Sequence, residues 1–213
     1  MKARKRLMII FLCFPLVLFA KTEQFQVNAK NSNVSFSIQN LSTITVKGRF
    51  YSVTGNILLD PKKPKKAYFE GGVLTSSINT KNNKRDKHLR SSDFFHVEKF
   101  PTIYFKTKKI KKKKGQLILI GDFRIKDITK RVKIPIKILG PKKDDWGLSH
   151  IGIKGAFEID RREYGLIWNK VLDTGNFLIG NKVKIELEIE ADTKITGLHT
   201  RQKPQSFFFK KQQ

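Results

Sequence analysis

Apolar and polar residues alternate along most of this chain, and this alternation limits its fold more than any other feature. Residues 34–39 alternate between apolar side chains and serine or glutamine, and residues 183–190 alternate between aliphatic side chains and lysine or glutamate. Successive side chains of a β-strand point to opposite faces. The pattern therefore predicts strands with one buried and one solvated face.

Further strand-like runs lie between these two, and stretches rich in Gly, Pro, Asn and Asp separate them; the runs are residues 48–60, 67–78, 102–108, 116–125, 131–139 and 152–159. Strands at this spacing, each with one apolar face, are typical of antiparallel sheets. The sequence predicts an all-β domain, either a barrel or a sandwich, with about eight strands.

One internal segment, residues 82–99, does not alternate. Its apolar residues are Leu89, Phe94, Phe95 and Val97, and "SSD" at 91–93 is a candidate helix N-cap. We expect one or two short helices here, beside the barrel or plugging it.

The first twenty residues differ from the rest. Four basic residues precede an apolar run from Leu7 to Ala20, which is too short for a membrane span of about 20 residues. This favours a signal peptide at 1–20 over an uncleaved anchor, and hence an exported protein, periplasmic or secreted. The sole cysteine, Cys13, lies within this segment, so the remaining chain has no disulfide, no thiolate nucleophile and no cysteine zinc site.

Alternation ends near residue 192. We assign 21–192 to one barrel domain and 193–213 to a disordered tail that is basic and aromatic. An alternative is that Phe207–Phe209, with the lysines beside them, contact a membrane interface.

The chain is strongly basic. It has 44 Lys and Arg against 18 Asp and Glu, and removal of the four basic residues of segment 1–20 leaves a net charge of +22. Such a field attracts anionic membranes or polyanions. Lysines dispersed on strand faces also have a simpler use, the protection of sheet edges.

Five ordered blocks between about residues 31 and 192 resemble the YceI-like family of polyisoprenoid-binding, lipocalin-like proteins. The blocks are "SNVSFSIQNL" with "VKGRFYSVTGNILLD", "SSINTKNNKRDKHLRSSDFFHVEKFPTIYF", "GDFRIKDITKRVKIPI", "FEIDRREYGLIW" and "IGNKVKIELEIEA". Asp127 stands where the family usually has glycine. The resemblance implies an extended eight-stranded antiparallel lipocalin-like barrel that holds a long apolar molecule.

The block from Arg85 to Pro101 contains acids, bases and phenylalanines, as an active site would. Asp86 follows Arg85 directly and Asp93 could cap a helical turn, so ion pairing and capping account for both acids. His88 has no sequence neighbour that would make it a general base. We therefore expect scaffolding rather than catalysis.

Metal sites and cofactors are not predicted either. His88, His96, His150 and His199 are dispersed, without a metal-binding spacing, and neither a nucleophile elbow nor a phosphate loop occurs. The ligand expected is an apolar lipid. Nucleic acid is not expected as a partner, and a homodimer is left open.

Aromatic and aliphatic residues of the strands and of the helical block could line a tunnel for that lipid. The predicted lining residues are Phe36, Ile38, Phe50, Ile57, Phe94, Phe95, Phe100, Phe105, Phe123, Phe157 and Trp168. The alternative from sequence is that they fill a solid core, and the family resemblance favours the tunnel.

Residues 106–115, "KTKKIKKKKG", hold seven lysines. We expect a charged hairpin whose Lys111, Lys112, Lys113 and Lys114 contact an anionic surface, or else a solvated loop that prevents aggregation. The sequence thus favours a non-enzymatic carrier of an amphiphilic lipid such as a polyisoprenoid, a quinone or a fatty-acid-like chain. The alternatives are a solid-core basic module that binds anionic lipid or polyanion, and, less favoured, a barrel enzyme.

Overall fold

The computed structural model describes residues 22–40, 44–170 and 179–193. The predicted signal peptide, Cys13, His199 and the predicted disordered tail lie outside the described residues, except for Thr193, the last residue of β11.

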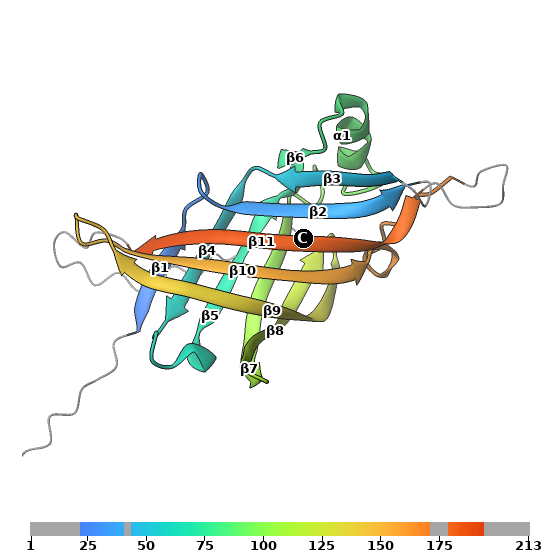
Figure 1. Cartoon of the computed structure of the whole chain (residues 1–213). Coiled ribbons are helices and arrows are strands. Elements are labelled where there is room, and N and C mark those ends of the chain that lie inside the picture. Colours follow the sequence, from blue (N-terminus) through green and yellow to red (C-terminus); the bar gives the residue numbers. More distant parts are fainter. Residues whose placement is uncertain (1–21, 41–43, 171–178, 194–213) are drawn as a thin grey trace, which may run out of the picture.

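Eight antiparallel strands close into an elongated barrel, which confirms the predicted fold (Figure 1). The ring closes because β1 pairs with the end of β11, with Phe25 opposite Thr193. In ring order the strands are β1 (Glu23–Val27), β4 (Val53–Leu59), β5 (Tyr68–Leu74), β7 (Thr102–Lys113), β8 (Gln116–Ile125), β9 (Ile128–Lys143), β10 (Ser149–Asp160) and β11 (Ile179–Thr193).

The first part of β11 pairs with a second partner, and the sheet continues from there through β2 (Asn33–Asn40), β3 (Ile44–Phe50) and β6 (Ile78–Asn79). Three short 3-10 helices complete the described elements: η1 (Pro64–Lys66), η2 (Thr75–Ser77) and η3 (Arg161–Tyr164). None of the helices in the described ranges is long and apolar enough to cross a membrane.

Two predicted strands are broken by a contact that alternation does not encode. Run 48–60 splits at Tyr51 and Ser52, whose backbone N–H groups donate to the carbonyl and the hydroxyl of Ser77. Run 67–78 splits at η2, to which Ser77 belongs. Hydrogen bonds therefore join the two breaks to each other. The first break is also the turn of the chain between β3 and β4.

The lysine run is not a loop. β7 extends to Lys113, which pairs with Gln116, so the turn consists of Lys114 and Gly115 alone. Their φ angles of 47° and 83° suit the two-residue hairpin turns that match strand twist. At the other end of β8, Ile125 pairs with Ile128, and the positive φ of this turn falls on Lys126 rather than on Asp127.

The segment 82–99 forms one α-helix, α1 (Asn83–Arg90), followed by turns. Asn82 is the N-cap, since its side chain accepts a hydrogen bond from the Arg85 backbone N–H. The predicted cap at "SSD" is wrong, because Ser91 ends α1 instead of beginning a second helix.

Candidate functional site

A cavity of about 630 Å³ occupies the barrel interior. This volume is within the range of small-molecule sites, and most of the side chains around it are aliphatic or aromatic. An eight-stranded barrel can either fill its lumen with side chains or enclose one small ligand. This barrel leaves space for a ligand.

Ten of the eleven predicted lining residues do border the cavity: Phe36, Ile38, Phe50, Ile57, Phe94, Phe95, Phe105, Phe123, Phe157 and Trp168. They come from six strands, the turns after α1 and the segment after η3. Several pack on one another edge to face, such as Phe123 on Phe157 with ring centroids 5.4 Å apart. Aliphatic residues whose side chains also point into the barrel, among them Val73 and Ile185, form the rest of the cavity wall.

Phe100 is the exception and is not among the lining residues. Its ring lies near His96 and within 6 Å of the ammonium groups of Lys99 and Lys126. The turns after α1 bring Phe94 and Phe95 inward and leave Phe100 outside the lumen. A count of phenylalanines along the sequence cannot reveal that difference.

Two glycines explain why large rings leave room in the lumen. Gly48 lies opposite Phe36 on the neighbouring strand, and a Cβ at Gly48 would collide with the Phe36 ring. A Cβ at Gly121 would collide in the same way with the ring of Phe105. Both rings therefore lie against bare backbone of the wall instead of projecting across the cavity.

Buried hydrogen bonds attach α1 to the barrel. Asp86 is 2% exposed, and it accepts from the backbone N–H and the hydroxyl of Thr80 at 2.9 and 2.6 Å. Arg85 donates to the hydroxyl and the carbonyl of Thr80, and Arg90 donates to the carbonyls of Ser76 and Ile78. These contacts support the expected scaffolding role, although Asp86 bonds to Thr80 rather than forming an ion pair with Arg85.

His88 has a partner that the sequence did not indicate. Its Nε2 lies 2.8 Å from Asp93 Oδ2, and its ring stands edge to face against Phe94 and Trp168 with centroids 5.0 and 4.7 Å away. The expectation that Asp93 caps a helix is wrong, because Asp93 follows the end of α1. His88 borders the cavity, so this pair lies at the end of the lumen beside α1.

Arg161 is a buried cation that also borders the cavity and is 3% exposed. Its guanidinium donates to the carbonyls of Leu166, Trp168 and Gly180, which joins η3 to the start of β11. Burial lowers its pKa below the ordinary value. The arrangement holds Trp168 beside α1.

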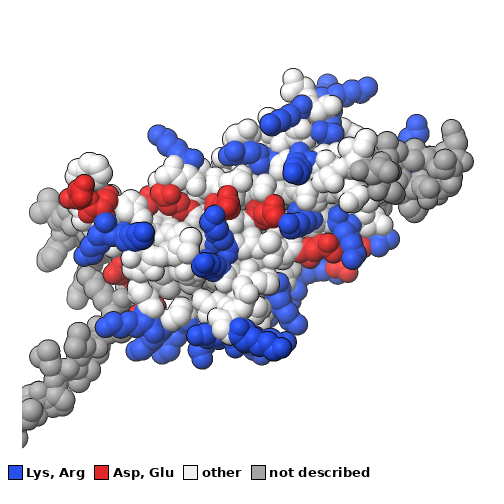
Figure 2. Space-filling view, in the orientation of Figure 1, with Lys and Arg blue, Asp and Glu red and all other residues white. Residues whose placement is uncertain are grey.

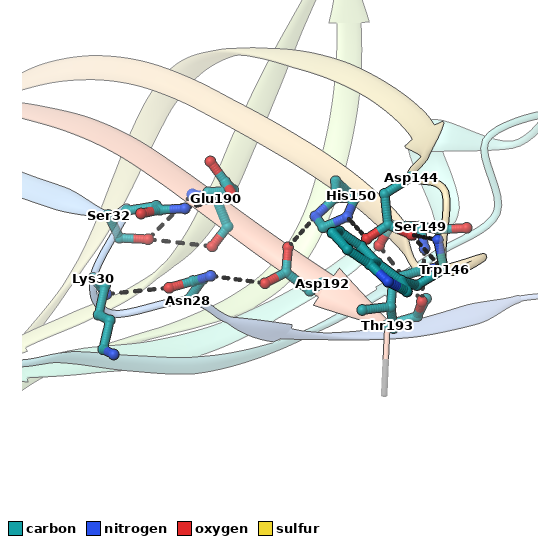
Figure 3. Close-up of polar contacts among 12 residues, drawn as sticks. Asn28, Lys30, Ser32, Asp144, Trp146, Ser149, His150, Glu190, Asp192 and Thr193 are labelled. Carbon is teal, nitrogen blue, oxygen red and sulfur yellow. Dashed lines mark hydrogen bonds and ion pairs between the residues drawn. The ribbon is translucent and has the colours of Figure 1, made fainter. Parts of the chain in front are cut away.

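At the opposite end of the barrel, His150 bridges two carboxylates (Figure 3). Its Nδ1 is 2.7 Å from Asp192 and its Nε2 is 3.0 Å from Asp144, and these hydrogen bonds, that to Asp144 above all, raise the pKa of His150. Although the sequence spacing argued against metal binding, the fold brings possible ligand atoms of His150, Glu190 and Asp192 within 4.8 Å of one another. Hydrogen bonds to both imidazole nitrogens give the cluster a structural role as a latch between the β9–β10 loop and β11.

The lysines of the predicted anionic contact are all exposed to solvent. Lys111, Lys112 and Lys113 are exposed on β7, and Lys114 is in the turn. Strand register extends the basic surface to β9, since Lys109 and Lys133 both pair with Ile120 of β8. We call the exposed lysines 109, 111 and 113 of β7 and 133 and 137 of β9 the basic face.

The basic face differs from the neighbouring outer surface. None of its five lysines forms an ion pair with another residue in the described part of the chain. On β10 and β11, in contrast, Lys154, Lys182 and Lys184 each pair with a glutamate. Figure 2 shows acidic residues interspersed along β10 and β11, and basic residues crowded along the lower edge of the view.

Known proteins resemble this chain over the same region. A model of the YceI-like domain matches residues 25–191. A UPF0312 protein of Staphylococcus aureus is 33% identical over 167 residues, which cover 78% of this chain and 95% of that protein. The structure of a Campylobacter jejuni YceI protein aligns with a TM-score of 0.62 and 25% identity, over 73% of this chain and 90% of the other.

A polyisoprenoid binding domain from Saccharophagus degradans, implicated in plant cell wall breakdown, aligns with a TM-score of 0.61. It is 10% identical, over 80% of this chain and 98% of that one, and therefore shows a shared fold.

Proposed function

Because the chain belongs to the YceI-like domain family, we propose that it is a non-enzymatic binding protein or carrier for an amphiphilic lipid. The ligand is a polyisoprenoid, an isoprenoid quinone or a fatty-acid-like chain, held in the barrel lumen without a cofactor. The name of the Saccharophagus degradans neighbour, a polyisoprenoid binding domain, supports a ligand of this kind.

The single observation that carries the proposal is the apolar cavity of about 630 Å³. Transfer of each CH₂ group from water into such a lumen contributes about 0.8 kcal/mol before ordering costs. A long chain can therefore bind through burial alone. The open lumen also counts against the alternative of a basic module with a solid core.

The polar residues of the block 85–101 support a role other than catalysis. Asp86, Arg85 and Arg90 are engaged in holding α1 on β6 and the residues around it. We propose further that residues 1–20 direct the protein out of the cytoplasm, so that it works in a periplasm or outside the cell.

The second part of the proposed function is the place where the carrier works, which is the surface of a membrane. We propose that the basic face lies against anionic lipid headgroups, so that the barrel stays near the membrane from which it takes its ligand. The carrying observation is the set of five lysines on two strands that form no ion pair with any residue the structure describes. A Lys near a charged membrane surface contributes about 1 kcal/mol.

The direct experiment is native mass spectrometry of the mature protein purified from its own cell envelope, followed by organic extraction. A co-purified mass whose fragments form an isoprene or acyl series supports the carrier and identifies its ligand. A bare protein mass that persists after incubation with isoprenoid quinones and fatty acids contradicts it. The same spectrum reports whether the protein is a homodimer.

A charge placed inside the lumen should abolish lipid uptake. Phe36→Lys puts an ammonium group against the apolar wall, whereas Gln39→Lys puts one on the exposed side of the same strand. We expect the first variant to lose binding of a fluorescent lipid and the second to keep it, with folding of both checked by circular dichroism. Equal uptake by a folded Phe36→Lys protein would exclude this part of the lumen as the binding site.

A further inference from the structure

The cavity has an apolar end and a cationic end, and this polarity bears on the ligand's headgroup. Building on the proposed function, we propose that the mouth beside α1 is an oxyanion site. The barrel then takes a long-chain amphiphile tail first, and Lys84 pairs with a negatively charged headgroup, a carboxylate or a phosphate ester.

The end of the barrel away from α1 is sealed. Phe25 of β1 and Ala191 of β11 have no exposed surface there, and Leu59 of β4 has 1%. Just inside this seal the cavity is bordered by Ile57, Ile134 and Ile136. A ligand that reaches the sealed end must present hydrocarbon to it, because no polar group of the ligand would find a partner among these side chains.

At the opposite end, polar and cationic side chains border the cavity alongside apolar ones such as Leu89 and Trp168. Asn82, Lys84, Arg85 and His88 of α1 and its cap lie there, as does Arg161. Lys84 is exposed, so the cavity reaches the surface at this point. A headgroup therefore comes to rest among these side chains once the tail fills the lumen.

The charged groups of the lining are unbalanced. Lys84, Arg85 and Arg161 are cations, and the acid is Glu70, whose carboxylate accepts hydrogen bonds from the hydroxyls of Tyr68 and Tyr104. Arg85 and Arg161 are committed to the protein's own oxygen atoms. The Lys84 side chain forms no hydrogen bond or ion pair with any other described residue, so its ammonium group is available to a ligand.

His88 stands beside Lys84. The two residues are four apart on α1 and thus share one face of the helix, the face toward the cavity. Asp93 holds His88 through Nε2, and Phe94 and Trp168 fix the plane of the ring. The other ring nitrogen, Nδ1, makes no hydrogen bond within the described ranges, and it can donate to the same headgroup when both ring nitrogens carry a proton.

The test uses a matched set of ligands that share one tail: hexadecanoic acid, hexadecyl phosphate and hexadecan-1-ol, each displacing the neutral fluorescent dye Nile red. Lys84→Gln is compared with Lys87→Gln. Lys87 is an exposed lysine on the same helix that does not border the cavity, which makes it a matched control.

We expect Lys84→Gln to weaken the acid and the phosphate about threefold to fivefold, the size of a partly exposed charge pair, and to leave the alcohol unchanged. Lys87→Gln should change none of the three. The relative affinity of the two anions for the unmodified protein tells which oxyanion the site prefers.

Equal affinity of the alcohol and both anions for the unmodified protein, or equal effects of the two substitutions, would overturn the oxyanion site and leave the carrier intact. If none of the ligands displaces the dye, and the dye itself does not bind, the proposed function fails and this inference fails with it.

Discussion

At the scale of single residues, partners differ from those that the sequence suggests. Asp86 lies next to Arg85 in sequence, yet its carboxylate is buried against Thr80, which is six residues away. Arg85 reaches the same threonine from the other side. Thr80 is thus one of the points at which α1 joins the barrel wall.

Asp86→Ala should lower the free energy of unfolding by about 3 kcal/mol, because it leaves two donors of Thr80 buried without a partner. Asp93→Ala removes an exposed carboxylate close by and should cost less than about 1 kcal/mol. Urea unfolding of both variants measures the difference. A loss as small for Asp86 as for Asp93 would show that α1 does not depend on this carboxylate.

At the scale of elements, the long strands are held at the sealed end by the His150 latch. Asp144 belongs to the β9–β10 loop and Asp192 to β11, so the imidazole joins two segments that are 48 positions apart in sequence. Asn28, which follows β1, donates to the other oxygen of Asp192. The latch therefore lies where β1 and β11 close the ring (Figure 3).

The latch should weaken as pH rises. Because the pKa of His150 is raised in the folded state above its ordinary value of 6.5, its contribution to stability is complete below that value. The contribution is lost as pH increases from about 6.5 through the folded-state pKa. We expect the free energy of unfolding of the unmodified protein to fall across this range relative to His150→Gln, as measured by urea unfolding at a series of pH values.

The two other histidines of the described chain, His88 and His96, remain in both proteins, so the difference between the two curves isolates His150. Parallel curves would mean that the imidazole bridges the two carboxylates without contributing to stability.

At the scale of the whole molecule, charge is distributed unevenly over the face of the barrel that Figure 2 shows. Three glutamates of β10 and β11 pair with lysines of these strands, whereas the basic face on β7 and β9 has no ion pairs within the described residues. Long-range attraction to an anionic surface should therefore act through one side of the barrel.

The triple variant Lys109→Gln, Lys111→Gln and Lys133→Gln should lose most of its binding to vesicles that contain anionic lipid, in a sedimentation assay at low salt. The triple variant Lys154→Gln, Lys182→Gln and Lys184→Gln removes the same charge from the paired surface and should bind more strongly than the first. Binding should fall with added salt in both cases. Equal losses would mean that net charge, not the basic face, drives the contact.

Alternation predicted antiparallel strands of a barrel or a sandwich, because burial of one strand face depends on local order alone, as in Ile134 and Ile136 between exposed Lys133, Pro135 and Lys137. The family resemblance selected the barrel. The same alternation predicted that Phe36, Phe105 and Phe123 face the interior, and they border the cavity. Phe100 does not border the cavity, because it lies between the turns after α1 and the start of β7, where no strand period applies. The strand breaks at Ser52 and η2 are joined by a hydrogen bond between residues 25 positions apart. The pattern of neighbouring residues therefore does not indicate them.

The sequence by itself determined that this chain forms antiparallel strands with one apolar face, that it is strongly basic, and that its motifs belong with one family. These properties follow from the order of neighbouring residues. Only the tertiary structure decided that the lumen is hollow, that Lys84 and His88 stand at its mouth, and that exposed lysines of β7 and β9 form one face. Each of these depends on which residues of different strands and helices meet, and strand register and ring closure determine that only when the whole chain has folded.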